Sequence, residues 1–467
     1  MTIHDTIIWL EWIFLLYFIG VNAGYIGLNI ISTIYISRYM SFHSLGKLPR
    51  PYSGFEPPVS ILVPACNEEE TIVSSVRALL QLTYPRFEII IINDGSTDDT
   101  LKVLKKEFSL VPVPATREQK LPSEPVKWEY LSRTHSNIRV LDKENGGKAD
   151  ALNAGINVSH YGLFCSVDAD SVLQRDSLQR VVYPFLEDPT TLATGGTIRI
   201  ANGCKIKDGF LIEPGLPDNL LAQFQVVEYL RAFLFGRMGW SPLNALMIIS
   251  GAFGLFHKNT VIAIGGYRKD SIGEDMELVV RIHHEMRLWG KPYRITFVPD
   301  PICWTEAPEN LSTLRKQRIR WQRGLAESLF QHIDLLFHRD GGTVGWLAFP
   351  FFLLFECLGP LLEVVGYLLM IVLFFFGLIP NYAMLAFLVV SIGLGILLSV
   401  CALFLEEMSF HLYPRMSHMF TLFLAAVAEN LGYRQLNSLW RLEGILSWLF
   451  GRKKSWGDMK RKKITHS

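Results

Sequence analysis

The chain has 467 residues, of which 49% are hydrophobic and 19% charged, with a formal net charge of +1 and a mean hydropathy of +0.24. It is too apolar for an ordinary soluble enzyme and too charged for a pure transporter, and it lacks the basic excess of a nucleic-acid binder. The 6 cysteines are scattered without a CxxC pair, which indicates a reducing compartment and argues against structural zinc.

The first predicted element is a transmembrane anchor within residues 1–37. The stretch 7–36 is almost wholly apolar and exceeds the roughly 20 residues that a helix needs to cross a bilayer. It lacks a basic start and a small-residue cleavage site, so an uncleaved anchor is favoured over a secretion signal. Basic residues follow it within 38–50 and return in the tail at 451–467. By the positive-inside rule we expect a protein of the cytoplasmic membrane whose middle domain and tail are cytosolic.

Residues 38–340 are mixed in polarity and predict a globular α/β domain. Short apolar runs that predict strands alternate with segments of helical spacing, at 59–64, 68–80, 87–92, 98–108 and 138–140. This alternation indicates a mostly parallel sheet with helices on both faces, whose ligands bind at the carboxyl ends of the strands. The Pro-rich stretch 111–134 is expected to be an insertion or loop outside the core. The stretch 201–240 matches no pattern that we can interpret.

Residues 341–450 predict a C-terminal transmembrane region. Apolar length places spans at about 345–378 and 383–406, and prolines in the first suggest that it begins as an interfacial segment. The stretch 419–450 fits either a hairpin or one span followed by an amphipathic helix. Because the basic tail and the globular domain share a side, we expect an even number of crossings after residue 342.

Carboxylates follow two of the predicted strands. Asp168 and Asp170 come directly after the apolar run 162–167, so both can approach one metal–diphosphate group. Taken alone, an Asp-x-Asp pair is as often a solvated turn. Asp94 follows the run 87–92 in an Asn-Asp-Gly-Ser sequence, for which a plain turn is the ordinary alternative.

A glycine-containing loop at 145–153 opens a predicted helix. Its glycines let a backbone approach a phosphate, and Lys148 adds positive charge. It is not a Walker A loop, because Ala149 stands where Ser or Thr would bind magnesium. This difference excludes an ATPase at this loop.

Glu274 and Asp275 begin the helical run 276–286. Acids at a helix start are usually caps that complement the helix dipole, and this is the ordinary alternative to a catalytic role. His283 and His284 lie within the same run. Adjacent histidines on a helix point about 100° apart, so we interpret them as solvated or packed rather than as a metal site.

A strongly basic helix is predicted to begin near Ser312. It carries Gln317, Arg318, Arg320 and Trp321, and arginine and tryptophan in this pattern can bind a diphosphate and stack on a sugar. The alternative is a basic helix that lies on the cytosolic leaflet, and both roles can hold together.

In their order and separations these motifs resemble those of the membrane-bound, processive family 2 glycosyltransferases, which include the poly-N-acetylglucosamine, hyaluronan, chitin and cellulose synthases. The resemblance covers most of the chain and implies a GT-A-like α/β domain between transmembrane helices. In that family a Pro-x-x-Asn-Glu segment and an Asp-Gly-Ser turn hold the uridine. The matching residues here are Pro64, Asn67, Glu68 and Asp94.

The resemblance also implies roles for the remaining motifs. Lys148 would face the diphosphate, and Asp168 and Asp170 would serve nucleotide-sugar and metal binding, with Asp170 preferred as the ligand of Mg²⁺ or Mn²⁺. Asp275 would be the general base beside Glu274. The residues implied at the diphosphate and the acceptor are Gln317, Arg318, Arg320, Trp321, Ser250 and Gly251.

The function implied is inverting, metal-dependent transfer of a sugar onto a growing polysaccharide that is exported across the membrane. The Asn-x-Gly-Lys-Ala-x-Ala-Leu-Asn form leans toward UDP-N-acetylglucosamine as donor. Two alternatives stay open: transfer of one sugar to a membrane lipid, and an idle nucleotide-sensing partner. The expected partners are the donor, a polysaccharide or glycolipid acceptor and the bilayer, with an accessory membrane subunit undecided.

Glu356 and Glu363 prompt a separate hypothesis. They lie seven residues apart in the first C-terminal span, hence nearly on one helix face. Acids at membrane depth usually face a protein interior or a wet cavity. We predict that they line or support a polysaccharide channel. The alternative is a structural pair with an arginine or a helix end.

Overall fold

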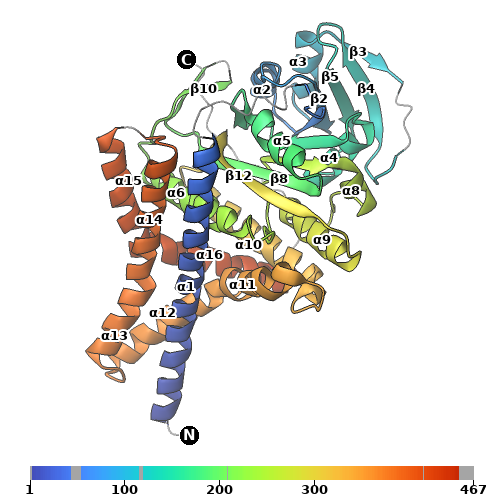
Figure 1. Ribbon diagram of the computed structural model, residues 1–467. Helices are drawn as coiled ribbons and strands as arrows, with labels where there is room; N and C mark the ends of the chain where they lie inside the picture. Colours follow the sequence, from blue (N-terminus) through green and yellow to red (C-terminus); the bar gives the residue numbers. More distant parts are fainter. Residues whose placement is uncertain (1–2, 44–53, 115–118, 208, 414, 452–467) are drawn as a thin grey trace.

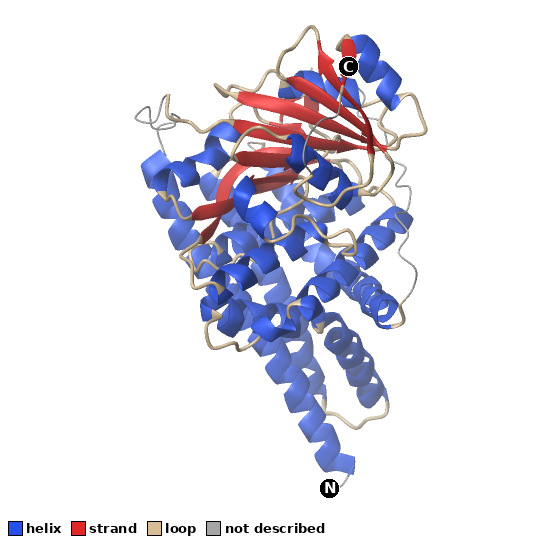
Figure 2. Cartoon of the chain, turned by 90° about the vertical axis from the view of Figure 1, so that its right-hand side faces the viewer, coloured by secondary structure: helices blue, strands red, loops and turns tan. Residues whose placement is uncertain are grey.

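The computed structural model describes residues 3–43, 54–114, 119–207, 209–413 and 415–451. A sheet with its covering helices forms one end of the molecule, and long helices extend from the other (Figure 1). Figure 2 shows that α1 (Ile3–His43) reaches furthest from the sheet. Segments far apart in the chain thus form the long-helix layer, where α1 contacts α12 (Gly359–Phe375) and α14 (Leu394–Ser409).

The main sheet is mixed. Its 10 strands lie in the order β3 (Leu110–Val113), β4 (Val126–Ser132), β5 (Ile138–Lys143), β2 (Phe87–Asp94), β1 (Val59–Ala65), β6 (Leu163–Val167), β11 (Phe253–His257), β8 (Thr191–Ile200), β12 (Arg294–Thr305) and β7 (Val172–Leu173). The run β5-β2-β1-β6 is parallel, as is the pair β8-β12, and the other pairs are antiparallel. The expected parallel sheet is therefore found at its centre, with antiparallel strands added on either side.

The main sheet is covered on its faces by helices. These include α2 (Ile72–Leu79), α3 (Thr100–Glu107), α4 (Lys148–Val158), α5 (Ser177–Glu187), α8 (Lys258–Ala263) and α9 (Glu274–Leu288). The four isoleucines from Ile89 to Ile92 are fully buried, as a strand sandwiched between helices requires. Gly155 lets α4 approach β1 and β2, because a Cβ there would lie 3.0 Å from Cδ1 of Ile92.

The prediction that 111–134 lies outside the core was wrong. β3 and β4 come from this stretch and add two antiparallel strands to β5. Pro112 hid the pattern, yet β3 is the edge strand, where a missing N–H is tolerated. Tyr130 on β4 is buried and supplies the core contact.

The stretch 201–240 connects the sheet to the long helices. It contains the two-stranded hairpin β9 (Lys205–Lys207) and β10 (Phe210–Glu213), then α6 (Leu220–Leu230), the π-helical segment η2 (Arg231–Arg237) and α7 (Met238–Trp240). Asn219 caps α6 by accepting a hydrogen bond from the Ala222 N–H. η2 contacts both α1 and α14.

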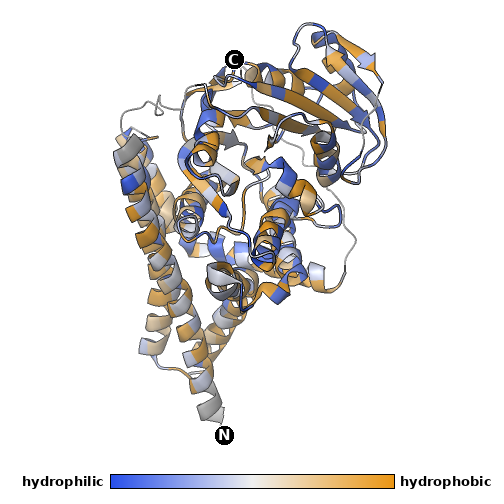
Figure 3. Ribbon diagram, turned by 45° about the vertical axis from the view of Figure 1, so that its right-hand side comes forward, coloured by the Kyte–Doolittle hydropathy of each residue, from blue (hydrophilic) through white to orange (hydrophobic). Residues whose placement is uncertain are grey.

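Within the described residues, two helices are long and apolar enough to cross a membrane: the part of α1 from Ile8 to Ser41, and Asn381–Ser409. The second comprises α13 (Asn381–Leu388), η6 (Val389–Gly393) and α14, and matches the span expected at 383–406. A third candidate is a pair, Val344–Cys357 and Gly359–Phe375, bent by 43°. It replaces the single span expected at 345–378 and contains η4 (Val344–Ala348), α11 (Phe349–Phe351), η5 (Phe352–Cys357) and α12. Figure 3 shows how apolar residues dominate these helices.

The stretch 419–450 forms α15 (Met416–Ala428), η7 (Glu429–Tyr433) and α16 (Arg434–Leu449), with a kink at Leu431 and Gly432. Neither half is a candidate span, and α16 packs on α12 and on α10 (Leu311–Gln331). A short 3-10 turn, η3 (Ile333–Leu335), follows α10. One or two candidate crossings thus follow residue 342 in the described chain, and the expected even number stays a prediction. The basic tail at 452–467 lies outside the described residues.

Candidate active site

A cleft of about 2510 Å³ opens beside the carboxyl ends of β1, β2 and β6. All the residues to which the family resemblance assigns a site role line it. They are Pro64, Asn67, Glu68, Asp94, Lys148, Asp168, Asp170, Ser250, Gly251, Glu274, Asp275, Gln317, Arg318, Arg320 and Trp321. Beyond α10 the cleft continues to the C-terminal helices at Glu356, Asn437 and Arg441. One continuous cleft therefore connects the loops of the sheet with η5 and α16.

At one end the loop after β1 is tied to the turn after β2. Asn67 has φ +58°, which Asn tolerates better than most residues. Its N–H donates to Ser96 Oγ at 3.0 Å, and its Oδ1 accepts from the Thr97 N–H at 2.8 Å. The Glu68 N–H donates to Thr100 Oγ1 at 2.9 Å. These bonds hold the two predicted uridine-binding segments as one unit.

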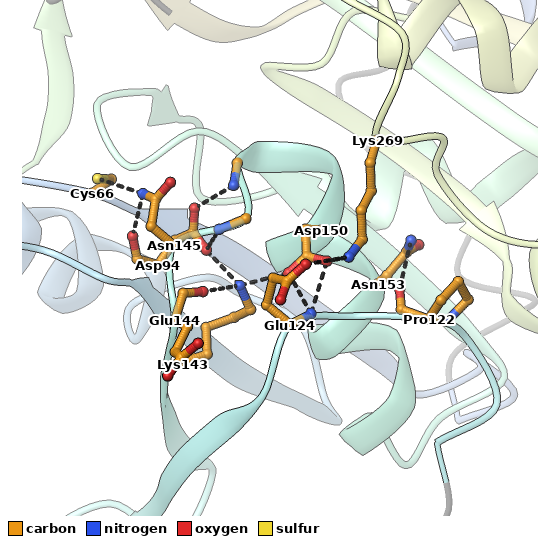
Figure 4. A network of polar contacts seen from close by, with 12 residues as sticks. Cys66, Asp94, Pro122, Glu124, Lys143, Glu144, Asn145, Asp150, Asn153 and Lys269 are labelled. Carbon is orange, nitrogen blue, oxygen red and sulfur yellow. Dashed lines mark hydrogen bonds and ion pairs between the residues drawn. The ribbon is translucent and has the colours of Figure 1, made fainter.

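Asp94 is buried and organises the neighbouring glycine loop (Figure 4). Its carboxylate accepts hydrogen bonds from the N–H groups of Gly146 and Gly147, at 3.0 and 2.8 Å. It also pairs at 2.6 Å with Lys143, a fully buried lysine at the end of β5. No sequence motif singles out Lys143, because a lysine that ends a strand is usually solvated.

Lys143 extends this network, because its Nζ also forms an ion pair with Asp150 Oδ1 at 2.6 Å. Asp150 further pairs with Lys269 and accepts from the Glu124 N–H at 3.0 Å (Figure 4). Burial would raise the pKa of Asp150, but the hydrogen bonds from Lys143 and Lys269 outweigh it and hold the pKa below its ordinary value. The buried charges of Asp94, Lys143 and Asp150 therefore hold the loop before α4 in place.

Lys148, the first residue of α4, lies at the centre of the cleft's acidic groups. Its Nζ donates to Asp168 Oδ1 at 2.5 Å and to the Gly251 carbonyl at 3.1 Å, and lies 3.7 Å from Glu274 Oε1. Burial lowers the pKa of Lys148, but the charges of Asp168 and Glu274 outweigh it, so its pKa is raised and the amine stays protonated. One cation thus joins the Asp-x-Asp turn to the start of α9.

Asp168 and Asp170 follow β6 as predicted. Carboxylate oxygens suit Mg²⁺ or Mn²⁺. Among the described residues no group of three or more His, Cys, Asp or Glu side chains could hold a metal. A metal at this pair would therefore need further oxygen ligands from the donor's diphosphate and from water, which is how Mg²⁺ usually binds at phosphate-transfer sites.

Glu274 and Asp275 occupy the first turn of α9. Asp275 accepts from the Gly251 N–H through Oδ2 and from the Met276 N–H through Oδ1, both at 2.8 Å. Glu274 is 8% exposed, and burial raises its pKa to about 7, with Lys148 opposing the rise and Asp275 adding to it. The two neighbouring acids therefore differ in their surroundings, one hydrogen-bonded by backbone and one buried beside a lysine.

Glycines bring these groups within reach of one another. A Cβ on Gly251 would lie 2.9 Å from Lys148 Nζ and 3.3 Å from Asp275 Oδ2. A Cβ on Gly324 would lie 2.9 Å from the Cα of Gly273, so paired glycines set α10 directly against the start of α9. Gly324 was missed in the sequence, although a glycine inside a helix is a recognised sign of close packing.

The motif residues of α10 divide into two groups. Arg318 is 4% exposed, pairs with Glu228 at 2.7 Å and lies 4.6 Å from the Trp321 ring centroid. Trp321 itself is 42% exposed on the cleft wall. Arg320 lies near enough to Glu274 for its charge to oppose the rise in that residue's pKa. Arg318 thus supports the tryptophan, whereas Arg320 faces the acidic centre.

At the far end of the cleft, α10 meets the C-terminal helices. Gln322 Nε2 donates to the carbonyls of Glu356 and Cys357 at 3.0 Å, and its Oε1 accepts from Arg441 at 2.8 Å. Arg441 pairs with the Glu356 carboxylate at 2.9 Å, and Tyr25 of α1 also donates to it. Glu356 therefore has the arginine partner of the structural alternative and yet lies on the cleft wall.

The expectation that Glu356 and Glu363 share one helix face was wrong. The helix breaks between them, at the 43° bend. Glu356 belongs to η5 and Glu363 to α12, where Ser438 of α16 donates to it. Glycine and proline at 359 and 360 explain the break.

The two adjacent histidines of α9 have separate surroundings. His283 is buried between the Tyr293 hydroxyl at 2.7 Å and the Leu246 carbonyl at 2.9 Å. Burial lowers the pKa of His283 to about 4, so it is neutral. His284 pairs with Asp334 at 2.8 Å. Their packing accounts for both without a metal.

The mixed sheet with an acidic cleft at the carboxyl ends of its parallel strands is the GT-A-like class of fold. Residues 57–324, more than half of the chain, match the family described as "Glycosyltransferase like family 2". The chain belongs to this family of glycosyltransferases, as its motifs predicted.

Relatives and a solved structure agree with this assignment. The chain is 32% identical over 275 residues to the poly-beta-1,6-N-acetyl-D-glucosamine synthase of Staphylococcus aureus (strain COL), covering 58% of this chain and 56% of the relative. It is 30% identical over 274 residues to the synthase of that name from Staphylococcus epidermidis, with the same coverage. The chain thus spans about half the length of these curated relatives.

The mannosyltransferase PcManGT from Pyrobaculum calidifontis, solved with GDP-Man and Mn²⁺, has a TM-score of 0.54 and 17% identity, covering 94% of this chain and 100% of its own. This likeness supports the fold alone.

Proposed function

We propose that the protein transfers N-acetylglucosamine from UDP-N-acetylglucosamine, with inversion, onto a growing polysaccharide. The observation that carries the proposal is the position of Asp275, which shares one cleft with the Asp-x-Asp pair, Lys148 and Trp321. The relation to synthases of poly-N-acetylglucosamine supports the choice of donor.

The donor would bind between the loop after β1 and the glycine loop. Asn67 and Glu68 would face the uridine, on a backbone held by Ser96, Thr97 and Thr100. Asp94 would act mainly by fixing the Gly146–Gly147 turn on which Lys148 stands. Asp168 and Asp170 would hold Mg²⁺ or Mn²⁺, which supplies positive charge for the diphosphate when bound.

The chemical step would place the acceptor hydroxyl beside Asp275. Oδ2 of Asp275 takes the hydroxyl proton while the hydroxyl oxygen forms a bond to the anomeric carbon of the donor sugar. The bond from that carbon to the diphosphate oxygen breaks on the opposite face, and its electron pair leaves with UDP. The anomeric centre is thereby inverted.

Two cations of the chain would stabilise the leaving group. Lys148 lies against Asp168, and Arg320 lies near Glu274, so both approach the negative charge that develops on the diphosphate. Fixed charges in a site shielded from water are the most effective form of transition-state stabilisation.

The membrane arrangement belongs to the same proposal. Residues 1–37 anchor the chain, 38–340 form the cytosolic transferase domain, 341–450 the C-terminal membrane region and 451–467 a basic cytosolic tail. The product would leave past Trp321 toward Glu356 and Arg441, where the cleft reaches η5 and α16. Export across the membrane would begin there.

A second candidate is transfer of a single sugar to a membrane lipid. The observation that favours it is the same extension of the cleft to η5 and α16, because a lipid-borne acceptor would also reach Asp275 from that side. The two candidates differ only in the size and nature of the product.

The test uses the full chain purified in nanodiscs, with UDP-N-acetylglucosamine, UDP-glucose, UDP-galactose and UDP-glucuronic acid offered separately. UDP release and product size are measured with Mg²⁺, with Mn²⁺ and with a chelator. We expect the fastest release with UDP-N-acetylglucosamine, long products, and no release with the chelator. A glycolipid with one added sugar would establish the second candidate. Absence of release from every donor would refute both.

A further inference from the structure

Arg237 is a cleft residue to which none of the motifs assigns a role. It ends the π-helical segment η2, within the stretch 201–240 that the sequence left uninterpreted. Its side chain lines the cleft together with Phe233 and Tyr229, which precede it by about one and two turns. The guanidinium lies over the Phe233 ring, 3.7 Å from its centroid.

The guanidinium of Arg237 has no anionic partner in the described part of the chain. Its Nη1 is buried and donates to no acceptor among the described residues, and no described carboxylate lies within ion-pair distance. Arg231, at the other end of η2, is the natural comparison. It donates to Glu429 and to Ser399, both at 2.6 Å. Arg318 and Arg281 likewise pair with Glu228 and Glu277.

Arg237 as a whole is half-buried, but its Nη1 is shielded from water and has no acceptor among the described residues. Such an unmade hydrogen bond of a charged group is costly, so its presence in a cleft calls for a ligand. Burial lowers the pKa of Arg237 to about 10, with Asp275 and Tyr229 acting in the opposite direction, so the guanidinium stays charged near neutral pH. The Phe233 face offsets part of the lost hydration through a cation–π contact. It leaves the N–H groups at the guanidinium edge available as donors.

The position of Arg237 points to the acceptor rather than the donor. Asp275 is the carboxylate whose charge acts on it most strongly, so Arg237 lies on the side of the proposed base. An anionic ligand here would be repelled by Asp275. A neutral sugar offers oxygens to the N–H groups and an apolar face to Tyr229, whose ring packs against Phe233 with 5.6 Å between the ring centroids.

We propose that Arg237 binds the terminal sugar of the acceptor, donating hydrogen bonds to its oxygens and so holding the reactive hydroxyl beside Asp275. This role rests on the proposed function, because it assumes that Asp275 is the base. It adds an acceptor contact from the segment between β10 and β11.

The test compares Arg237→Met and Arg237→Lys with Arg231→Met as the matched control from the same segment. Initial rates are measured against the concentrations of UDP-N-acetylglucosamine and of N-acetylglucosamine oligosaccharides, together with donor hydrolysis and the thermal midpoint. Arg237→Met should raise the acceptor KM by about tenfold or more, as loss of a charged hydrogen bond does. Donor KM and hydrolysis should stay within about twofold, and the thermal midpoint should hold or rise.

Arg237→Lys should recover part of the acceptor affinity, because the charge is kept and donors are lost. Arg231→Met should lower the thermal midpoint and leave the acceptor KM of the folded protein unchanged, because it strands Glu429. An unchanged acceptor KM, a parallel rise in donor KM, or a fall in the Arg237→Met midpoint would each overturn the proposal. The proposal would also be overturned if Arg237→Met lost transfer to a lipid phosphate acceptor but kept transfer to the oligosaccharides.

Oligosaccharide binding without donor is measured by calorimetry on the same proteins. Weaker binding by Arg237→Met would support the acceptor role even if the wild-type protein released no UDP, a result that would count against the proposed function alone. Equal binding by both proteins would overturn the acceptor role.

Discussion

The two ends of the cleft are built in different ways. At the donor end the polar contacts join loops of one domain, as when Asp94 holds Gly146 and Gly147. At the membrane end four helices from distant parts of the chain meet, and Glu356 is contacted by Tyr25, Gln322 and Arg441. The donor end is thus encoded in short motifs, whereas the membrane end depends on how the helices pack.

The largest effect is expected where the two ends meet, at Asp275. Asp275→Asn keeps an oxygen that can accept from the Gly251 N–H but removes the base, so sugar transfer should fall by roughly 10²- to 10⁴-fold. UDP binding, measured by calorimetry, should be unchanged. Transfer at the wild-type rate by a folded Asp275→Asn protein would rule out this residue as the base.

Glu274 gives the centre of the cleft a pH dependence. Its folded pKa of about 7 exceeds the ordinary carboxyl value of 4.5, so its contribution to stability is complete below about pH 4.5 and is lost as pH rises through 7. By pH 8 the loss is at most roughly 3 kcal/mol. Glu274→Gln should remove this loss, which thermal unfolding at pH 5, 6, 7 and 8 would measure. A variant with the wild-type pH dependence would contradict the assignment.

Gly324 tests whether α10 must lie against α9. Gly324→Ala would place a Cβ 2.9 Å from the Cα of Gly273, so α10 must shift and carry Trp321 and Arg320 with it. We expect a destabilisation of about 1–3 kcal/mol and a transfer rate reduced by roughly tenfold. Gly27→Ala, where a Cβ meets nothing within 4 Å, is the control. Equal losses in the two variants would show that the glycine contact has no special role.

The smallest effect is expected at the membrane end. Arg441→Met leaves the Glu356 carboxylate without its ion pair and should destabilise the protein by about 1–2 kcal/mol, since both side chains are about a quarter exposed. Products should become shorter while donor hydrolysis is kept. Arg315→Met, which removes the exposed pair with Glu443 between α10 and α16, should change neither quantity. If both variants gave shortened products, product length would not depend on the ion pair of Glu356.

The contrast between the ends also explains what the sequence could predict. Pro64, Asn67, Lys148 and Asp168 were found because each lies in or directly after a regular element, at an offset that a motif records. The parallel strands then bring these residues to one edge of the sheet, so residues far apart in the chain share one cleft.

The remaining features depend on contacts that no local pattern records. Lys143 and Glu228 look like ordinary surface residues until their partners, Asp94 and Arg318, are placed beside them. Arg237 could not be noticed, because its distinguishing property is a missing partner. The bend between Glu356 and Glu363 was signalled by Gly359 and Pro360, but apolar length favoured a straight span.

The most direct measurement is an electron cryo-microscopy map of the wild-type protein in nanodiscs, purified with Mn²⁺, UDP and its own product after a round of synthesis. We expect glycan density that begins beside Asp275, passes Trp321 and continues along α10 to Glu356 and Arg441. Glycan density that instead leaves the cleft at the donor end, beside Ser74 and Gly209, would contradict the proposed path and the role of the membrane end in receiving the product.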